Sequence, residues 1–333
     1  MQTALIMQVL EVAELAAIAA ARYNGLGDKH TADQAATSAM REAFNNIDFA
    51  GRIVIGEGER DEAPMLFIGE QVGRGWTNSN IPESSIFDIA VDPLEGTNLC
   101  AYNQPNALTT IAIAPKGALL YAPDTYMLKI AAGAQAKASG RLHIDNSVAA
   151  NIQALSEALD KPVGEINVCI LNRDRHDQLI REVRATGARI RLIEDGDVFG
   201  AIATAVPGTG IDLYLGSGGA PEGVLAACGL KAIGGFFMGR MAFELDKDGV
   251  AKRRRAELTA EIDLDAPLSL DTLVRTDDAA FIASGVTDGE MLAGVHVDKD
   301  GSVTTSSLVM STEDSSTRFI RTIRRSATGV IQF

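Results

Sequence analysis

A regular alternation of strands and helices in the middle of the chain does most to limit its fold. Short runs rich in Ile, Val and Leu are each followed by a segment whose apolar residues recur at helical spacing. Strands that alternate with helices at this spacing indicate βαβ units and a parallel sheet, and therefore an α/β fold. The expected strands lie at residues 166–171, 190–193 and 212–215, and the expected helices at 177–186, 198–205 and 221–230.

The rest of the chain is less regular. Its 333 residues exceed what one compact core usually holds, so we expect two closely packed α/β halves, 1–160 and 161–333. The charged segment 246–287 is weakly periodic and predicts a surface excursion, and the chain closes with a basic stretch. The other expected elements are helices at 3–22, from 31 or 33 to 45 and at 151–159, and strands at 52–55, 86–91, 107–114, 117–122 and 308–310, with 107–114 and 117–122 expected to form an antiparallel pair.

The composition excludes several classes of protein. A net charge of −14 repels phosphate backbones and anionic membranes, so we expect neither nucleic acid nor membrane as a partner. Cys100, Cys169 and Cys228 are too few for a disulfide framework or a thiolate zinc site, and they predict buried, reduced thiols. Glu11 and Glu14 interrupt the N-terminal apolar pattern, which is unlike a signal peptide, so the expected location is cytoplasmic.

Two groups of acidic residues directly follow predicted strands. One is Asp92-Pro93-Leu94-Glu95-Gly96-Thr97, and the other is the segment 56–62, which contains Glu57 and Asp61. Ligands of open α/β sheets bind beyond the carboxyl ends of strands, and clustered carboxylates are hard donors suited to Mg²⁺ or Mn²⁺. An ordinary Asp-Pro turn and an acidic surface loop are the alternatives.

Two further segments are open to more than one interpretation. Asp33 opens a predicted helix, where it is either an N-cap or a ligand. The glycine-rich segment 216–223 fits neither G-x-G-x-x-G nor a Walker A motif, but it places a helix N-terminus where an anion can bind. Glu222 lies in the first turn of that helix, where it serves either the helix dipole or a metal.

Seven segments, in order along residues 1–235, identify a family. The chain resembles the class II fructose-1,6-bisphosphatases, including the bifunctional fructose-1,6-/sedoheptulose-1,7-bisphosphatases of cyanobacteria, within the lithium-sensitive, Mg²⁺-dependent sugar and inositol phosphatases. Glu95 stands where the wider superfamily has a second Asp, as in the class II branch. The segments are GDKHTADQAA at 27–36, GRIVIGEGERDEAPML at 51–66, DIAVDPLEGTN at 88–98, APDTYMLK at 122–129, LNRDRHDQLI at 171–180, LIEDGDV at 192–198 and GSGGAPEGV at 216–224.

The resemblance implies a layered α/β/α/β/α sandwich and a homo-oligomer, dimer or tetramer. It also implies roles for individual residues. The implied metal ligands are Asp33, Glu57, Asp92, Glu95 and Glu222. The implied phosphate and sugar contacts are Glu95, Gly96, Thr97, Tyr126, Arg173, Asp174, Arg175, Asp195, Gly196, Asp197 and Gly219. Lys29 and Asp61 match positions at the catalytic centre, and Asp174 stands where the family usually has a proline.

These roles predict a metal-dependent hydrolysis of the C1 phosphate of fructose 1,6-bisphosphate. Thr97 would orient the attacking water, Asp61 would take its proton, and Arg173 with Arg175 would hold the other phosphate. By composition alone, two loop arginines after a strand are more often part of the solvated surface. An inositol- or nucleotide-type phosphatase of the same superfamily and a non-catalytic sugar-phosphate binding protein are the alternative functions.

Overall fold

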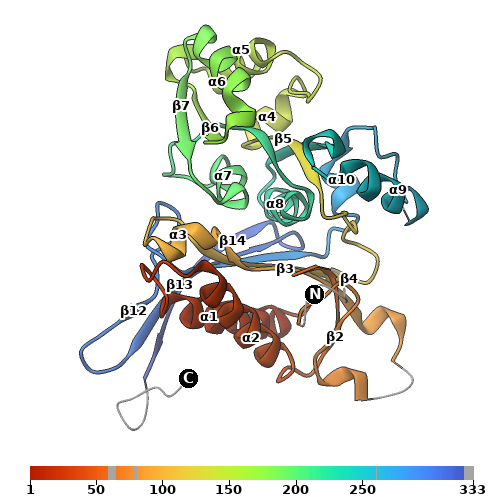
Figure 1. The fold of residues 1–333 in the computed structure, drawn as a ribbon, viewed down its shortest axis with the longest axis vertical. Helices are drawn as coiled ribbons and strands as arrows, with labels where there is room; N and C mark the ends of the chain where they lie inside the picture. The colour runs from red at the N-terminus through yellow and green to blue at the C-terminus, as the bar shows by residue number, and fades with distance from the viewer. Residues whose placement is uncertain (59–64, 78–80, 260, 326–333) are drawn as a thin grey trace. The chain divides into compact units, whose positions relative to one another are not determined.

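The computed structural model describes residues 1–58, 65–77, 81–259 and 261–325, which form two compact units, each with its own sheet (Figure 1). Unit 1 comprises Met1–Leu119 and Thr276–Phe333, and unit 2 comprises Leu120–Arg275. The boundary that we expected near residue 160 lies inside unit 2. The chain returns to unit 1 because its C-terminal strands pair with the sheet of that unit.

The sheet of unit 1 has eight strands in the order β12-β13-β11-β4-β3-β1-β2, with β14 paired to β13. Among the described strands of this sheet, only β1 and β3 run parallel to each other, and their carboxyl ends therefore share one edge of the sheet. The strands are β1 (Ala50–Ile55), β2 (Gln71–Val72), β3 (Ile86–Glu95), β4 (Leu108–Pro115), β11 (Ala280–Gly285), β12 (His296–Val297), β13 (Val303–Ser311) and β14 (Ser316–Arg324).

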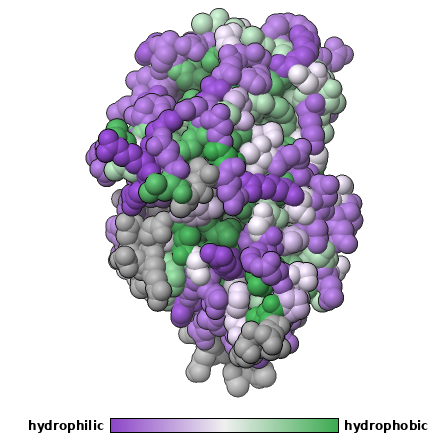
Figure 2. Space-filling model, turned by 90° about the vertical axis from the view of Figure 1, so that its right-hand side faces the viewer, coloured by the Kyte–Doolittle hydropathy of each residue, from purple (hydrophilic) through white to green (hydrophobic). Residues whose placement is uncertain are grey.

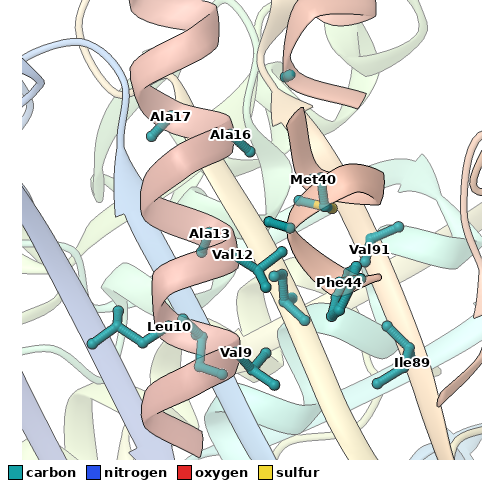
Figure 3. Packing of buried hydrophobic residues seen from close by; sticks show 14 of the residues in the cluster. Val9, Leu10, Val12, Ala13, Ala16, Ala17, Met40, Phe44, Ile89 and Val91 are labelled. Carbon is teal, nitrogen blue, oxygen red and sulfur yellow. The ribbon is translucent and has the colours of Figure 1, made fainter. Parts of the chain in front are cut away.

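Helices α1 (Thr3–Ala21) and α2 (Lys29–Phe44) pack against each other and against this sheet. Figure 3 shows side chains of α1 beside Met40 and Phe44 of α2 and beside Ile89 and Val91 of β3. By length and composition α1 could cross a membrane, but 56% of its apolar window is buried in unit 1, as in a core helix. The short helix α3 (Thr97–Ala101) directly follows β3 and packs on α2.

The sheet of unit 2 has the order β10-β9-β5-β8-β6-β7, in which β6 is parallel to β7 and β8 and the other pairs are antiparallel. Helices α5 and α6 cover one face, and α7 and α8 cover the other (Figure 1). The strands are β5 (Tyr126–Ala132), β6 (Asn167–Leu171), β7 (Arg189–Ile193), β8 (Leu213–Gly219), β9 (Phe236–Met241) and β10 (Leu268–Ser269). The α-helices are α4 (Ala134–Ser139), α5 (Val148–Leu159), α6 (Asp177–Thr186), α7 (Asp197–Ala203), α8 (Ala220–Ala232), α9 (Gly249–Thr259) and α10 (Leu270–Leu273), and 3-10 helices lie at η1 (Arg74–Thr77), η2 (Glu83–Ser85), η3 (Val163–Glu165), η4 (Asp174–His176) and η5 (Phe243–Leu245).

The predicted mixed α/β class with two sheets is confirmed, whereas several local predictions are wrong. Residues 117–122 form a turn and an irregular segment, so β4 pairs instead with β3 and β11. The segment 246–287 is not a surface excursion throughout, because it contains α9 and ends in β11, all six residues of which are buried. Strand β11 is buried along its whole length and lies inside the sheet, between β4 and β13.

The visible surface is mainly hydrophilic (Figure 2). Figure 2 shows a face made mostly of hydrophilic residues, with hydrophobic ones in small separate groups. Hydrophobic residues instead form one core between α1, α2 and the sheet of unit 1, and another between α5, α6 and the sheet of unit 2. Each unit therefore has its own hydrophobic core.

The core of unit 1 predicts a strong contrast between two phenylalanines. Phe44 is fully buried in that core, whereas Phe319 on β14 is 57% exposed. Phe44→Ala should lower the free energy of unfolding by about 3–5 kcal/mol, because it removes the ring and leaves a cavity. Phe319→Ala should change it by only about 0.5 kcal/mol. Urea denaturation of both variants checks this, and equal losses would contradict the packing described.

Candidate active site

The parallel pair β1 and β3 brings two groups of acidic residues to one edge of the unit 1 sheet. Ile55 of β1 lies opposite Ala90 of β3, and each strand leads to an acidic residue two positions further on. These residues are Glu57 and Asp92, both half-buried. The register therefore places the two predicted ligands at the same level, Glu57 just beyond β1 and Asp92 near the carboxyl end of β3. Asp61 lies outside the described residues.

Strand β3 does not end at Asp92, as the sequence predicted, but continues through a bulge to Glu95. Asp92 lies opposite Thr110 and Glu95 lies opposite Leu108, so β3 has one residue more than β4 across this stretch. Pro93 is tolerated here because a bulge interrupts the hydrogen bonding of the strand. The Leu94 N–H donates to Asp92 Oδ1 at 3.1 Å, which holds the carboxylate beside the bulge.

Gly96 then turns the chain from β3 into α3. Its φ of 82° lies in the left-handed region, which favours glycine, and a Cβ atom here would lie 2.8 Å from Leu99 Cδ1. Thr97 is consequently the first residue of α3, two positions beyond Glu95, which is only 5% exposed. Three of the predicted contacts thus follow one another in a single rigid turn.

Helix α2 contributes Asp33 and Lys29 to the same unit. Asp28, rather than Asp33, caps the helix, and it accepts hydrogen bonds from the Thr31 N–H at 3.0 Å and the Thr31 hydroxyl at 2.5 Å. Asp33 is therefore not needed as a cap. Its burial raises the pKa of its carboxyl above the usual value, and a nearby cation would reverse that shift. Lys29 is exposed.

In unit 2 the glycines at the end of β8 make room for functional side chains. A Cβ atom on Gly216 would lie 3.2 Å from the imidazole of His176, one on Gly218 would lie 1.7 Å from Asp197 Oδ2, and one on Gly219 would lie 1.9 Å from Glu222 Oε2. These glycines belong to a strand that pairs with β5, and not to the strand-to-helix loop that the sequence suggested. These glycines therefore leave the space that the side chains of His176, Asp197 and Glu222 occupy.

A buried ion pair lies beside these glycines. Lys129 of β5, whose side chain is 1% exposed, donates to Asp197 at the start of α7. Glu222 of α8 interacts electrostatically with both Lys129 and Asp197. Burial, with a smaller contribution from the Asp197 carboxylate, raises the pKa of Glu222, and Lys129 partly offsets this.

Glu222 Oε2 is buried and makes no hydrogen bond in the described structure. A buried carboxylate oxygen without a partner costs free energy unless a cation or a proton compensates it. The donor at this position is thus of the type that binds a hard divalent cation. Among the described residues, no group of three or more His, Cys, Asp or Glu side chains is placed to hold a metal ion. The predicted ligand set therefore stays a prediction.

The predicted phosphate and sugar contacts of unit 2 lie at the start of β5, after β6, after β7 and at the end of β8. Arg175 stacks on the ring of Tyr126, with its Cζ 4.8 Å from the ring centroid. Arg173 donates to the Asn172 carbonyl at 3.0 Å and lies 3.5 Å from Asp195 Oδ1.

Asp174 is exposed in η4, before α6. Gly196, with a φ of 85°, precedes buried Asp197 in α7. Among the described side chains, the structure thus brings Tyr126 and Arg175 together, and Arg173 with Asp195.

Sequence reasoning missed Lys129, His176 and Ser217, which support these predicted contacts. Lys129 interrupts the apolar run YMLKIAA, and a lysine inside a buried strand is the one signal that pointed to an internal ion pair. The prediction that the cysteines are buried is confirmed. Burial raises the pKa of Cys100 to about 11 and that of Cys228 to about 12, so both stay protonated thiols at neutral pH.

Carboxylates at the carboxyl ends of parallel strands are hard donors of the kind that metal-dependent phosphatases use. A family model for the bacterial fructose-1,6-bisphosphatase, glpX-encoded, matches residues 3–324. The chain therefore belongs to the bacterial fructose-1,6-bisphosphatase family, whose members are metal-dependent phosphoric monoester hydrolases.

Relatives with similar sequences carry one description, D-fructose 1,6-bisphosphatase class 2/sedoheptulose 1,7-bisphosphatase. The protein of Thermosynechococcus vestitus is 45% identical over 331 residues, covering 95% of this chain and 94% of the relative. That of Trichormus variabilis is 44% identical over 336 residues, covering 97% and 96%. A solved structure of extragenic suppressor protein suhB from Bartonella henselae is 18% identical, with a TM-score of 0.31 over 61% of this chain and 70% of that chain, and we draw no argument from it.

The close approach at Gly218 generates a prediction. Gly218→Ala would place a methyl group on the Asp197 carboxylate and separate it from Lys129, so it should destabilise the protein by about 1–3 kcal/mol through overpacking. Gly164→Ala, in the same unit, is the control, because its added Cβ would meet nothing closer than 3.8 Å. Thermal melts compare the two, and a Gly218→Ala variant that melts like the control would contradict the packing of the ion pair.

Proposed function

We propose that the chain hydrolyses the C1 phosphate of fructose 1,6-bisphosphate to fructose 6-phosphate and phosphate, and that it also accepts sedoheptulose 1,7-bisphosphate. The family match over almost the whole chain carries this proposal. The relatives described as bifunctional bisphosphatases support the wider substrate range, because they match over 95% or more of this chain. We further propose that it works in the cytoplasm as a dimer or tetramer.

We propose Mg²⁺ or Mn²⁺ as the cofactor. When bound, such a cation neutralises charge on the phosphoryl oxygens and makes water a better nucleophile. The proposed ligands share hard carboxylate oxygens, and the raised pKa values of Asp33 and Glu222 are consistent with groups that need a cation nearby. These ligands are Asp33, Glu57, Asp92, Glu95 and Glu222.

The residues around β3 provide the proposed groups that act on water and on the reacting phosphate. Thr97 begins α3, where its hydroxyl is fixed to a rigid turn and can orient a water molecule. Asp61 would take the proton of that water, which is the task of a general base. Glu95 and Gly96 line the same turn, and Lys29 supplies a positive charge from the first turn of α2.

Unit 2 provides the proposed contacts for the second phosphate and the sugar. Arginine donates hydrogen bonds in a planar fork that matches phosphate oxygens, which assigns this role to Arg173 and Arg175. Tyr126 supports Arg175 through ring stacking. The proposed sugar and remaining contacts are Asp174, Asp195, Gly196, Asp197 and Gly219.

A substrate panel tests the proposed function directly. Phosphate release from fructose 1,6-bisphosphate should require Mg²⁺ or Mn²⁺, should stop on exhaustive chelation and should return when the metal is added back. Sedoheptulose 1,7-bisphosphate should also react, whereas inositol phosphate and adenosine bisphosphate should react poorly. Faster release from either of these two would support the alternative phosphatase type. Binding of the bisphosphate without any phosphate release would support a non-catalytic protein.

Arg173 tests the second-phosphate contact. Arg173→Ala should lower kcat/KM for fructose 1,6-bisphosphate about 10–150-fold, the effect of losing a hydrogen bond to a charged group. It should have little effect on a small monophosphate, which has no second phosphate. Arg181→Ala is the control, because Arg181 is an exposed arginine of α6 that bonds Gln178. Equal losses on both substrates would place Arg173 outside the second-phosphate contact.

A further inference from the structure

Arg175 is held in place by Tyr126 and by Ser217, a residue that has no role in the proposed function. Its Nε–H donates to Ser217 Oγ at 2.9 Å and its Nη2–H donates to the Ser217 carbonyl at 2.9 Å. One edge of the guanidinium is thus fixed to a single residue of β8, and one face rests on Tyr126. Two of the five N–H donors are used in this way, which leaves three without a hydrogen bond among the described residues.

Ser217 is in turn fixed by His176. The backbone N–H of Ser217 donates to His176 Nε2 at 2.9 Å, and Ser217 Oγ lies 2.9 Å from the same nitrogen. His176 Nδ1 lies 2.8 Å from the carbonyl oxygen of Leu171. A carbonyl needs a donor and an N–H needs an acceptor, so the network assigns the proton to Nδ1 and leaves Nε2 as an acceptor.

The surroundings of His176 favour this neutral form. Burial, and to a smaller extent the charges of Arg175 and Arg173, lower the pKa of the imidazole. His176 also occupies the N-cap position of α6 without capping it, because its ring faces β8 instead. Gly216 opposite has no side chain, and a Cβ there would lie 3.2 Å from the ring. Both observations indicate a residue that the fold uses to hold Ser217.

We propose that His176 and Ser217 are positioning residues that hold the Arg175 guanidinium ready for the non-reacting phosphate of the substrate. An exposed arginine loses much rotamer freedom when it binds a ligand, and fixing it in the folded protein removes that cost from binding. The inference rests on the proposed function, because only the proposed function assigns the non-reacting phosphate to Arg175. The network of Lys129, Asp197 and Glu222 plays no part in this inference.

Binding of fructose 6-phosphate tests the inference, because this molecule carries only the non-reacting phosphate. Ser217→Ala removes one oxygen atom and should weaken its Kd about tenfold in calorimetric titration of the full chain. Arg175→Ala should weaken binding at least as much, and adding Ser217→Ala to it should have no further effect. Such non-additivity is expected when one residue acts only through the other.

Ser156→Ala is the matched control. Ser156 is a buried serine of α5 in the same unit, and its hydroxyl donates to the Lys161 carbonyl at 2.6 Å. This variant should lose stability but bind fructose 6-phosphate like the wild type. If Ser217→Ala does not fold, His176→Gln replaces it in the same experiment. His176→Gln should weaken the binding of fructose 6-phosphate in the wild-type background and have no effect in the Arg175→Ala background.

A direct measurement accompanies the titration. The Nε–H resonance of Arg175 in a ¹H–¹⁵N spectrum, assigned by its loss in Arg175→Lys, should be protected from exchange in the wild type and unprotected in Ser217→Ala. Unchanged affinity in Ser217→Ala, or additive losses in the double variant, would overturn the inference. A wild type that binds fructose 6-phosphate but releases no phosphate from the bisphosphate would refute the proposed function alone.

Discussion

The buried ion pair between Lys129 and Asp197 is the interaction around which unit 2 is organised. It joins β5 to α7 across the face of the sheet that α7 and α8 cover. A buried charge without its partner costs about 3–5 kcal/mol, so both residues have to stay in contact. Gly218 has no side chain because a Cβ would occupy the position of the carboxylate. The same lysine partly compensates Glu222, and the pair thus makes it possible for a further carboxylate to be buried nearby.

The negative net charge of the chain limits how it can bind an anionic substrate. With a net charge of −14, the whole molecule repels a sugar bisphosphate, so any attraction has to come from local cations. In unit 2 the proposed cations are Arg173 and Arg175, which contact Asp195 and Ser217 respectively. In unit 1 the proposed carboxylate ligands, which lie after β1 and at the end of β3, would need divalent cations for the same purpose. Binding of metal and binding of substrate are therefore coupled by charge in the proposed function.

Much of the fold could be predicted from the sequence, because hydrophobic periodicity fixes elements with a strong local pattern. Helix α1 and strands β6 and β7 lie within one or two residues of their predicted bounds. Long-range pairing carries no such signal. Strand β11 follows a charged segment in the sequence, yet it joins the unit 1 sheet between β4 and β13, and this pairing places the end of the chain in unit 1. The cap of α2 could not be identified from the sequence, because Asp28 and Asp33 are both good capping residues and only the structure shows that Asp28 takes this position.

The part of the candidate site that could be predicted from the sequence is the set of carboxylates, because acidic residues are unusual at the ends of buried strands. Acidic residues after β1 and β3 are visible in the sequence because carboxylates rarely follow buried strands in clusters. The supporting residues were not visible, because a serine and a histidine have many ordinary roles, and only their contacts show that they hold Arg175. The role of the glycines of β8 stayed open for a related reason. A missing side chain can serve a bound anion or a neighbouring side chain, and the sequence alone does not distinguish a space left for a ligand from one left for the protein itself.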